Sequence, residues 1–224
     1  MKKIKLLQLL ILMIYTATVY CQDYTYKGKF INGLALVNSG GKKNGEIVLG
    51  GKFGFINKNN EKTIPLIYDF ARDFNKGFAI VNKGMKISAD SSKIEGPGLY
   101  GIIDSTGKIV IPIIYDIIAP TDYNMYIVRK DGKMGWIDYN GNVKIPLIYD
   151  DAKDELTGNL LRVKKGSKWG YIDIYGNEII PFIYDNVGRF KDGKHAICKK
   201  DGKEISIDLP VDLIKSKAGQ NSGK

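Results

Sequence analysis

Four times along the chain the same pattern of residues returns, so a fold must accommodate every copy in the same way. The clearest copy is "KWGYIDIYGNEIIPFIYD", residues 168–185, and related strings occupy residues 52–69, 99–116 and 133–150. Glycine and proline columns both step by 47, 34 and 35 residues: Gly54, Gly101, Gly135 and Gly170; Pro65, Pro112, Pro146 and Pro181. A period of about 35 residues with one enlarged step predicts tandem repeats with an insertion in one copy.

Each copy contains three segments typical of β-strands. The first, such as residues 168–173, alternates large side chains with the glycine, and the second is the apolar run through the proline, such as residues 178–183. A glycine that can adopt positive φ stands between them, so the pair predicts a β-hairpin. The turn positions are Gly107, Gly141 and Gly176, with Asn60 as a tolerated substitute. A third strand follows each linker, at residues 34–38, 78–82, 125–129 and 160–164.

Insertions fall between the third strand and the next glycine strand. This interval is 7 residues from Val128 to Gly135, but 17 from Val37 to Gly54. The long segments, residues 38–52 and 82–99, are predicted to leave the same edge of neighbouring units as loops. Such loops are where repeat proteins commonly bind partners. Insertions that surface loops tolerate without any function would produce the same pattern.

Both ends of the chain differ from the repeats. Residues 1–21 combine Lys2, Lys3 and Lys5 with a short apolar run, which predicts a signal peptide and export to the periplasm, the cell surface or the medium. An anchor through acylated Cys21 is the alternative, disfavoured by the bulky Tyr20 before it. Cleavage removes three lysines and no acid, so the formal charge falls from +10 to +7. The remaining Cys198 has no disulfide partner, and we expect no membrane span in the mature chain.

The last unit is degenerate. Glu204 and Ser206 stand where Trp169 and Tyr171 stand one period earlier. Polar residues in place of stacked aromatic residues are what a terminal cap requires, since no further unit covers its outer face. The segment after residue 209 is rich in Gly, Ser, Lys and Asn and is predicted to be a flexible tail.

The strings "KWG" and "GWID", followed by "G-x-x-IIP-x-x-YD", resemble the WG (KWG) β-repeat family over residues 51–185, and weakly beyond. Tryptophan itself stands only at Trp136 and Trp169. The resemblance implies a repeated all-β domain, often exported by bacteria, with no common enzymatic activity and hence no catalytic residues to transfer.

We therefore predict an all-β fold of about five units of about 35 residues, each a three-stranded antiparallel unit. The units form either a propeller-like ring or an open superhelical array, because the rotation between units is not encoded in the repeat pattern. The predicted segments are a signal peptide (1–21), an incomplete N-terminal repeat with its loop (22–50), the repeat domain with its cap (51–209) and the tail (210–224).

Recurring acids and aromatic residues were considered as sites. One aspartate column precedes the hairpin turn (Asp104, Asp138, Asp173, with Asn57 in the first copy), and another follows tyrosine (Asp69, Asp116, Asp150, Asp185). A glycosidase needs one pair of carboxylates, whereas these recur in every copy, so turn capping is the favoured interpretation. Too few oxygen ligands gather in one turn for calcium. The tyrosines Tyr68, Tyr115, Tyr149 and Tyr184 are interpreted as half-buried between layers rather than as an exposed ladder for ligands.

His195 and Cys198 could suggest a thiol protease pair, but three residues apart in a strand they point to opposite faces. Both fall in columns of apolar residues, so they are interpreted as variants of core positions. Because the chain has one histidine, it has too few ligands for a typical zinc site and little basis for a serine protease triad. No cofactor or metal is predicted.

Lysines form the candidate binding site. Two columns recur at the short turns of the later units: Lys130, Lys165 and Lys200; Lys133, Lys168 and Lys203. If equivalent positions stack, these six residues form a basic ridge that can attract anionic glycans, lipopolysaccharide phosphates or acidic proteins. The simpler alternative is a set of solubilising lysines. Nucleic acid is not expected, because no aromatic residues alternate with the lysines on this edge.

The sequence thus predicts a non-catalytic binding or protein-interaction scaffold at the bacterial cell envelope, whose partner is an envelope protein or an anionic glycan. The alternatives are a hydrolase acting on envelope polysaccharide and a purely structural spacer. Sequence leaves the partner and the oligomeric state open.

Overall fold

The structure is a computed structural model that describes residues 23–157, 160–190 and 194–209. The predicted signal peptide with Cys21 and the predicted tail lie outside the described residues, so both stay predictions. Within the described ranges the secondary structure is built from strands and turns, in agreement with the predicted all-β class.

The described strands form five antiparallel meanders. Sheet 1 contains β1 (Tyr26–Ile31), β2 (Leu34–Asn44), β3 (Ile47–Asn57) and β4 (Lys62–Tyr68). Sheet 2 contains β5 (Phe70–Ala71), β6 (Phe78–Ile87), β7 (Ile94–Asp104) and β8 (Ile109–Tyr115). Sheet 3 contains β9 (Ile117–Pro120), β10 (Tyr126–Lys130), β11 (Lys133–Ile137) and β12 (Val143–Tyr149). Sheet 4 contains β13 (Asp151–Thr157), β14 (Leu160–Lys165), β15 (Lys168–Asp173) and β16 (Glu178–Tyr184). Sheet 5 contains β17 (Asn186–Val187), β18 (His195–Lys200) and β19 (Lys203–Asp208).

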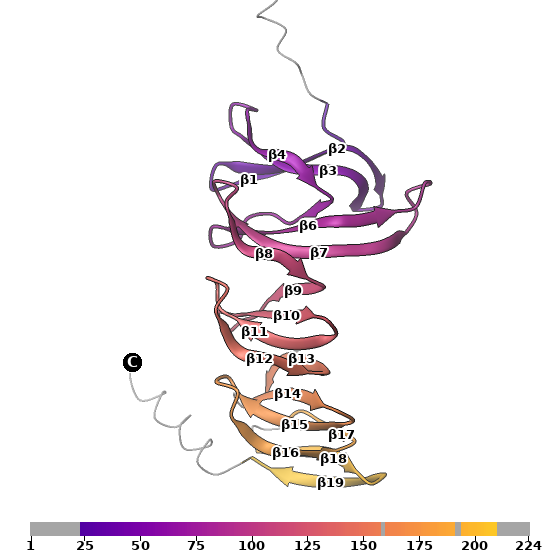
Figure 1. Ribbon diagram of the computed structural model, residues 1–224, viewed down its shortest axis with the longest axis vertical. Helices are drawn as coiled ribbons and strands as arrows, with labels where there is room; N and C mark the ends of the chain where they lie inside the picture. The colour runs from indigo at the N-terminus through magenta and orange to yellow at the C-terminus, as the bar shows by residue number, and fades with distance from the viewer. Residues whose placement is uncertain (1–22, 158–159, 191–193, 210–224) are drawn as a thin grey trace, which may run out of the picture.

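The sheets follow one another along the long axis of the molecule, with sheet 1 and sheet 5 at opposite ends (Figure 1). Of the two predicted arrangements, the described residues therefore form the open array rather than a ring. The repeat period and antiparallel pairing are confirmed, but three strands per unit is one too few for sheets 1 to 4. In sheets 2 to 4 the extra strand lies just after the Tyr-Asp pair, and β5 and β9, with two and four residues, are too short for a periodic pattern.

The sheets are also out of phase with the sequence copies. The third strand of one copy pairs with the glycine strand of the next copy: β6 with β7, β10 with β11 and β14 with β15. A copy therefore contributes its glycine and proline strands to one sheet and its last strands to the following sheet.

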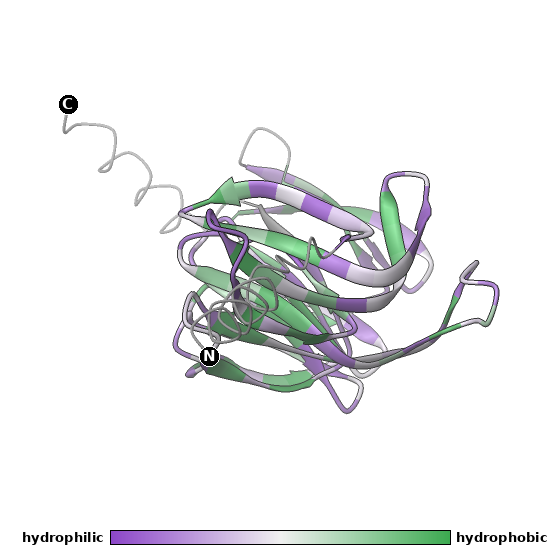
Figure 2. Cartoon of the chain, turned by 90° about the horizontal axis from the view of Figure 1, so that it is seen from above, coloured by the Kyte–Doolittle hydropathy of each residue, from purple (hydrophilic) through white to green (hydrophobic). Residues whose placement is uncertain are grey.

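The two predicted loops are in fact hairpin extensions. β2 and β3 remain paired as far as Asn44 and Ile47, and β6 and β7 as far as Ile87 and Ile94. We call these extensions, residues 39–52 and 83–99, the two arms. Their glycine and lysine content suggested loops, but the backbone hydrogen bonds of the core strands simply continue outward. Seen along the stack, hairpins project from its side (Figure 2).

The glycine column is explained by an arch in each proline strand. Phe53 pairs with Tyr68 and Phe55 with Ile64, so three residues of β4 lie opposite Gly54 alone. A Cβ atom on this glycine would lie 2.6 Å from the carbonyl oxygen of Ile64. The arch brings backbone so close that only glycine fits, and the same contact recurs at Gly101, Gly135 and Gly170.

The core lies between consecutive sheets. Trp136 and Tyr171 of the glycine strands are fully buried, and β15 is buried on both faces from Trp169 to Ile172. The tyrosine column is more deeply buried than predicted, with exposed fractions between 3% and 8%. This burial raises the pKa of each of these tyrosines and excludes their use as an exposed ladder.

Sheet 5 ends the stack as the predicted cap. Glu204 and Ser206 are exposed, whereas Ile205 and Ile207 pack against the core cluster of sheets 4 and 5. Ile205 stands in the glycine column, where a side chain is possible because no proline strand follows β19 in the described residues.

Candidate binding edge

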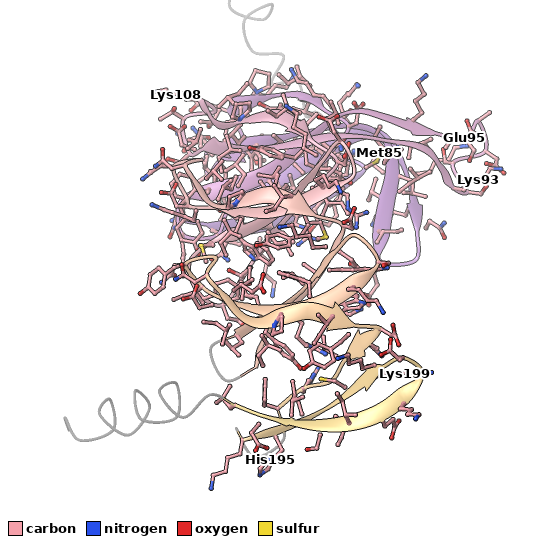
Figure 3. The ribbon with its side chains drawn as sticks, turned by 60° about the horizontal axis from the view of Figure 1, so that its bottom comes forward. Met85, Lys93, Glu95, Lys108, His195 and Lys199 are labelled. Carbon is pink, nitrogen blue, oxygen red and sulfur yellow. The ribbon has the colours of Figure 1, made fainter. Side chains whose placement is uncertain are left out.

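One edge of the stack carries the connection between the second and third strand of every sheet (Figure 1). We call it the hairpin edge. Sheets 1 and 2 extend there into the arms, whereas sheets 3 to 5 close with two-residue turns. Met85, Lys93 and Glu95 on the second arm lie on the same side as Lys199, and Lys108 and His195 lie on the other side (Figure 3).

The six lysines of the predicted ridge flank these turns as three cross-strand pairs: Lys130 with Lys133, Lys165 with Lys168, and Lys200 with Lys203. The residues of these turns have positive φ values, which few residues other than glycine, asparagine and aspartate adopt. Asp131 and Gly132 have 52° and 74°, and Asp201 and Gly202 have 48° and 77°. Tight turns thus place the lysine pairs at equivalent positions on three successive sheets.

The aspartates that follow tyrosine neutralise part of this ridge. Lys133 Nζ lies 2.5 Å from Asp150 Oδ1, and Lys168 Nζ lies 2.6 Å from Asp185 Oδ1. Lys52 makes the same pair with Asp69 in sheet 1. The lysine hydrogen bond is the main cause that lowers the pKa of Asp150 and of Asp185.

The second carboxylate oxygen of the same aspartates reaches the next sheet. The Gly166 N–H donates to Asp150 Oδ2 at 2.7 Å, and the Gly202 N–H donates to Asp185 Oδ2 at 3.1 Å. Asp69 accepts the Gly84 N–H in the same way at 2.7 Å. These aspartates therefore join consecutive sheets, a structural role that depends on contacts between distant residues.

A constant spacing could have revealed these links. Each lysine precedes its aspartate by 17 residues, and in the remaining copy Leu99 replaces the lysine before Asp116. Of the six predicted binding residues, Lys133 and Lys168 are engaged in these pairs. Lys165 lies over the Phe182 ring at 5.9 Å, and Lys130, Lys200 and Lys203 have no ion pair among the described residues.

Both arms bend at a pair of facing glycines. Gly40 and Gly51 in the first arm have φ values of 81° and 66°, and Gly84 and Gly98 in the second have 85° and 64°. A Cβ atom at Gly51 would lie 2.3 Å from the Gly41 nitrogen, so β3 cannot carry a side chain at this bend, whereas Gly40 has space for a Cβ atom but a φ of 81° that favours glycine.

A buried asparagine supports each bend. Asn38 Nδ2 donates to the Gly50 carbonyl at 3.1 Å, and Asn82 Nδ2 donates to the Pro97 carbonyl at 2.9 Å. Both side chains have no exposed surface. The tip of the second arm is held by Asp90, whose hydrogen bonds from Ser88 and Ser92 lower its pKa to about 2. The arms are thus shaped projections that expose Ile47 and Ile94.

The aspartates before the hairpin turn cap that turn in every copy. Asp138 Oδ1 accepts the N–H groups of Asn140 and Asn142, both at 2.9 Å. Asp104, Asp173 and Asn57 make the same two backbone bonds in their copies. The turn-capping interpretation is confirmed for this column; for Asp69, Asp150 and Asp185 it is wrong, because their carboxylates accept an N–H of the next sheet instead of capping their own turn. Burial alone would raise the pKa of Asp138, but hydrogen bonds from Asn142, Asn140 and Lys144 outweigh it and lower the pKa to about 2.

This pKa predicts acid-sensitive stability. The ordinary aspartate pKa is about 3.9, so the stabilisation from Asp138 is complete above about pH 4 and is lost as pH falls toward 2. We expect Asp138→Asn to keep the fold, because Asn57 makes the same backbone bonds, and to cost about 1 kcal/mol at neutral pH. Denaturant unfolding of both proteins at pH 7 and near pH 2 measures this. A difference that stays constant with pH would contradict the assignment.

A cavity of about 110 Å³ lies between sheets 2 and 3, lined by apolar groups such as Phe78, Tyr126 and Tyr139. At two other junctions, between sheets 1 and 2 and between sheets 4 and 5, an aromatic residue stands five positions after the Tyr-Asp aspartate and packs on the preceding glycine strand. Phe74 packs on Phe55 at 4.6 Å, and Phe190 on Tyr171 at 5.1 Å between ring centroids. Thr121 occupies this position between sheets 2 and 3.

Asp73 also lines this cavity, and partial burial raises its pKa. It is the one carboxylate among the lining residues, which otherwise include the cations Arg72 and Lys76. Lys76 donates to Asn124 at 3.2 Å and lies over the Tyr139 ring at 5.7 Å, so it connects the two sheets beside the cavity. The cavity is smaller than the ~300 Å³ at which ligand pockets usually begin.

His195 and Cys198 do not form a pair. Cys198 is buried in the core as predicted, 3.9 Å from the Tyr171 hydroxyl, and burial raises the pKa of its thiol. The core position predicted for His195 is wrong, because sheet 5 is terminal and leaves this side chain exposed, with Nδ1 2.6 Å from Asp208 Oδ1. Among the described residues, no group of His, Cys, Asp and Glu is arranged to hold a metal ion.

The repeats of this stack match a known family. The model of the WG containing repeat matches residues 53–86, 100–133, 134–169 and 169–203, so the chain belongs to the WG β-repeat family. No curated protein matches the chain. In the described part of the chain, no helix has the length and apolar character needed to cross a membrane.

Proposed function

We propose that this WG-repeat protein is an exported, non-catalytic binding scaffold of the bacterial cell envelope. The observation that carries the proposal is the hairpin edge, where two shaped arms and three lysine pairs come together on one side of a stack of sheets. The lysine pairs suit an anionic glycan or an acidic surface of an envelope protein. Export is supported by the basic and apolar N-terminal sequence.

The environment of the carboxylates also supports binding over hydrolysis. Asp104, Asp138 and Asp173 are committed to turn caps, and Asp69, Asp150 and Asp185 to links between sheets; the pKa is lowered for Asp104, Asp138, Asp150 and Asp185. A glycosidase would need a general acid with a raised pKa and a second carboxylate within about 10 Å. Asp73 has a raised pKa, but the residues that line its cavity include no second carboxylate. If envelope polysaccharide were hydrolysed, Asp73→Asn would abolish the activity, which gives the alternative a direct test.

Charge reversal on the hairpin edge tests the proposed surface. The variant Lys130→Glu, Lys165→Glu and Lys200→Glu should lose at least about tenfold in affinity for anionic envelope glycans, measured by calorimetry on residues 22–224. The matched control reverses Lys29, Lys58 and Lys108, which are exposed away from these turns. Equal losses in both variants would show a nonspecific charge effect, and unchanged binding in the first would remove the lysine turns from the proposal.

A further inference from the structure

The last strand of sheets 1 to 4 presents apolar side chains to solvent. The isoleucine two positions after the proline is exposed in each copy: Ile67 at 45%, Ile114 at 39%, Ile148 at 43% and Ile183 at 38%. The four prolines are exposed as well. The arch over the glycine column causes this exposure, because three residues facing one cannot all remain in the plane of the sheet.

These residues recur at equivalent positions of four successive sheets. The proline strands β4, β8, β12 and β16 are all edge strands of their sheets. These strands, together with Ile117 directly after the second Tyr-Asp pair, contain half of the exposed large hydrophobic residues that the structure describes. The set is Ile67, Ile109, Ile114, Ile117, Val143, Ile148 and Ile183. We call this set with the four prolines the apolar stripe. Contiguous apolar surface of about 300–600 Å² usually marks an interaction site.

An extended peptide is a poor occupant for the stripe. Adding a strand to an edge requires free backbone N–H groups in register, and each of these edge strands carries a proline, which has none. A partner must instead contact side chains, and it must present apolar groups at the spacing of the sheets to engage all four units. A second copy of this chain has that spacing.

Charge selects the orientation of such a pair. The first residues of the four proline strands are Lys62, Ile109, Val143 and Glu178, and all are exposed. A two-fold axis parallel to these strands, passing between sheets 2 and 3, reverses the order of the sheets in the partner. Lys62 then faces Glu178 of the second copy, and Ile109 faces Val143. The four first residues therefore match their counterparts in the second copy, with opposite charges at the ends and apolar residues in the middle.

We propose that two copies of this chain form an antiparallel dimer through the apolar stripe, with Lys62 of each copy paired with Glu178 of the other. Burying the stripe on both copies would remove on the order of 1,000 Å² of surface, near the lower limit for a specific interface. The dimer leaves the hairpin edge outside the contact, so the inference goes beyond the proposed scaffold function and does not depend on it.

A charge swap tests the pairing. On residues 22–224, which contain every described strand, sedimentation velocity over a micromolar concentration series gives the dimer dissociation constant. Lys62→Glu and Glu178→Lys each place like charges together and should weaken the dimer about tenfold, whereas the double variant should restore it. Two whole sheets lie between these residues within one chain, so restoration can only come from a contact between copies.

The apolar contact has its own matched pair of variants. Ile114→Glu with Ile148→Glu should give a monomer. Ile47→Glu with Ile94→Glu should leave the dimer intact, although these two isoleucines on the arms are the more exposed pair. Circular dichroism confirms folding in each case. A wild-type protein that is monomeric at high micromolar concentration would overturn the proposal. So would a stripe variant that still dimerises, or a double charge variant whose dimer affinity is not restored. Capture of another protein by the stripe would not rescue the proposal in any of these cases.

Discussion

Replacing Gly135 with alanine is expected to lower the free energy of unfolding by about 3 kcal/mol. The added Cβ atom would lie 2.6 Å from the Ile145 carbonyl oxygen and 2.8 Å from the Leu147 nitrogen. Both are backbone atoms of the arch in β12, so relief requires the whole proline strand to move away from β11. Denaturant unfolding of residues 22–224, followed by circular dichroism, measures the change.

Gly96 provides the control for this substitution. It lies in the second arm, and a Cβ atom there would meet only the Lys86 side chain, at 3.5 Å or more. Gly96→Ala should therefore leave stability unchanged within about 0.5 kcal/mol. Similar losses for Gly135→Ala and Gly96→Ala would mean that the close approach of the arch is not what requires glycine in this column.

The second large effect is expected for Trp136→Ala. Trp136 is fully buried between sheets 3 and 4, and its ring meets Tyr149 edge-on at 6.3 Å between centroids. Its Nε1–H also donates to the Tyr123 hydroxyl at 2.9 Å, which fixes the linker between β9 and β10. Truncation removes this burial and leaves a cavity, at a cost of about 3–5 kcal/mol.

Tyr175 is the matched aromatic residue on the surface. Its side chain is 76% exposed at the turn between β15 and β16, so Tyr175→Ala should change the unfolding midpoint little. Thermal and urea unfolding of both variants compare the two sites. A Trp136→Ala protein as stable as Tyr175→Ala would contradict the assignment of this tryptophan to the core between the sheets.

The regular features of the fold were predictable because local chemistry determines them. Gly107, Gly141 and Gly176 adopt φ values of 86°, 86° and 90°, and Asn60 adopts 63° in the same role. The capping aspartates also act within four residues of their own position. A pattern that depends only on a turn repeats in the sequence as clearly as in the structure.

Pairing between residues far apart in the sequence was harder to predict than the turns. The repeat boundaries in the sequence follow the hairpin of the glycine and proline strands, whereas the sheets form across copies, because a strand pairs with its nearest neighbour in space. The arms were interpreted as loops since Gly40, Gly51, Gly84 and Gly98 resemble turn residues, although they bend paired strands.

The six lysines lie along one edge, as their period predicts, but the aspartates that neutralise two of them were not predicted. The position of the six lysines follows from the period alone. Their partners do not, because Lys133 and Lys168 reach Asp150 and Asp185 at the end of the neighbouring proline strand, and only the constant 17-residue spacing indicates these pairs. The exposed isoleucines were missed for a related reason: an apolar residue in a strand suggests burial, and the arch that exposes it depends on backbone geometry.

The offset between sequence copies and sheets has a consequence for how such a chain can change length. Because every period ends in the middle of a sheet, a duplicated period completes one existing sheet and begins the next, wherever the cut is made. Each insertion of this kind adds one sheet and creates only junctions of a type already present. The stack can therefore lengthen or shorten during evolution by whole sheets while its turns, caps and inter-sheet aspartates keep the same contacts.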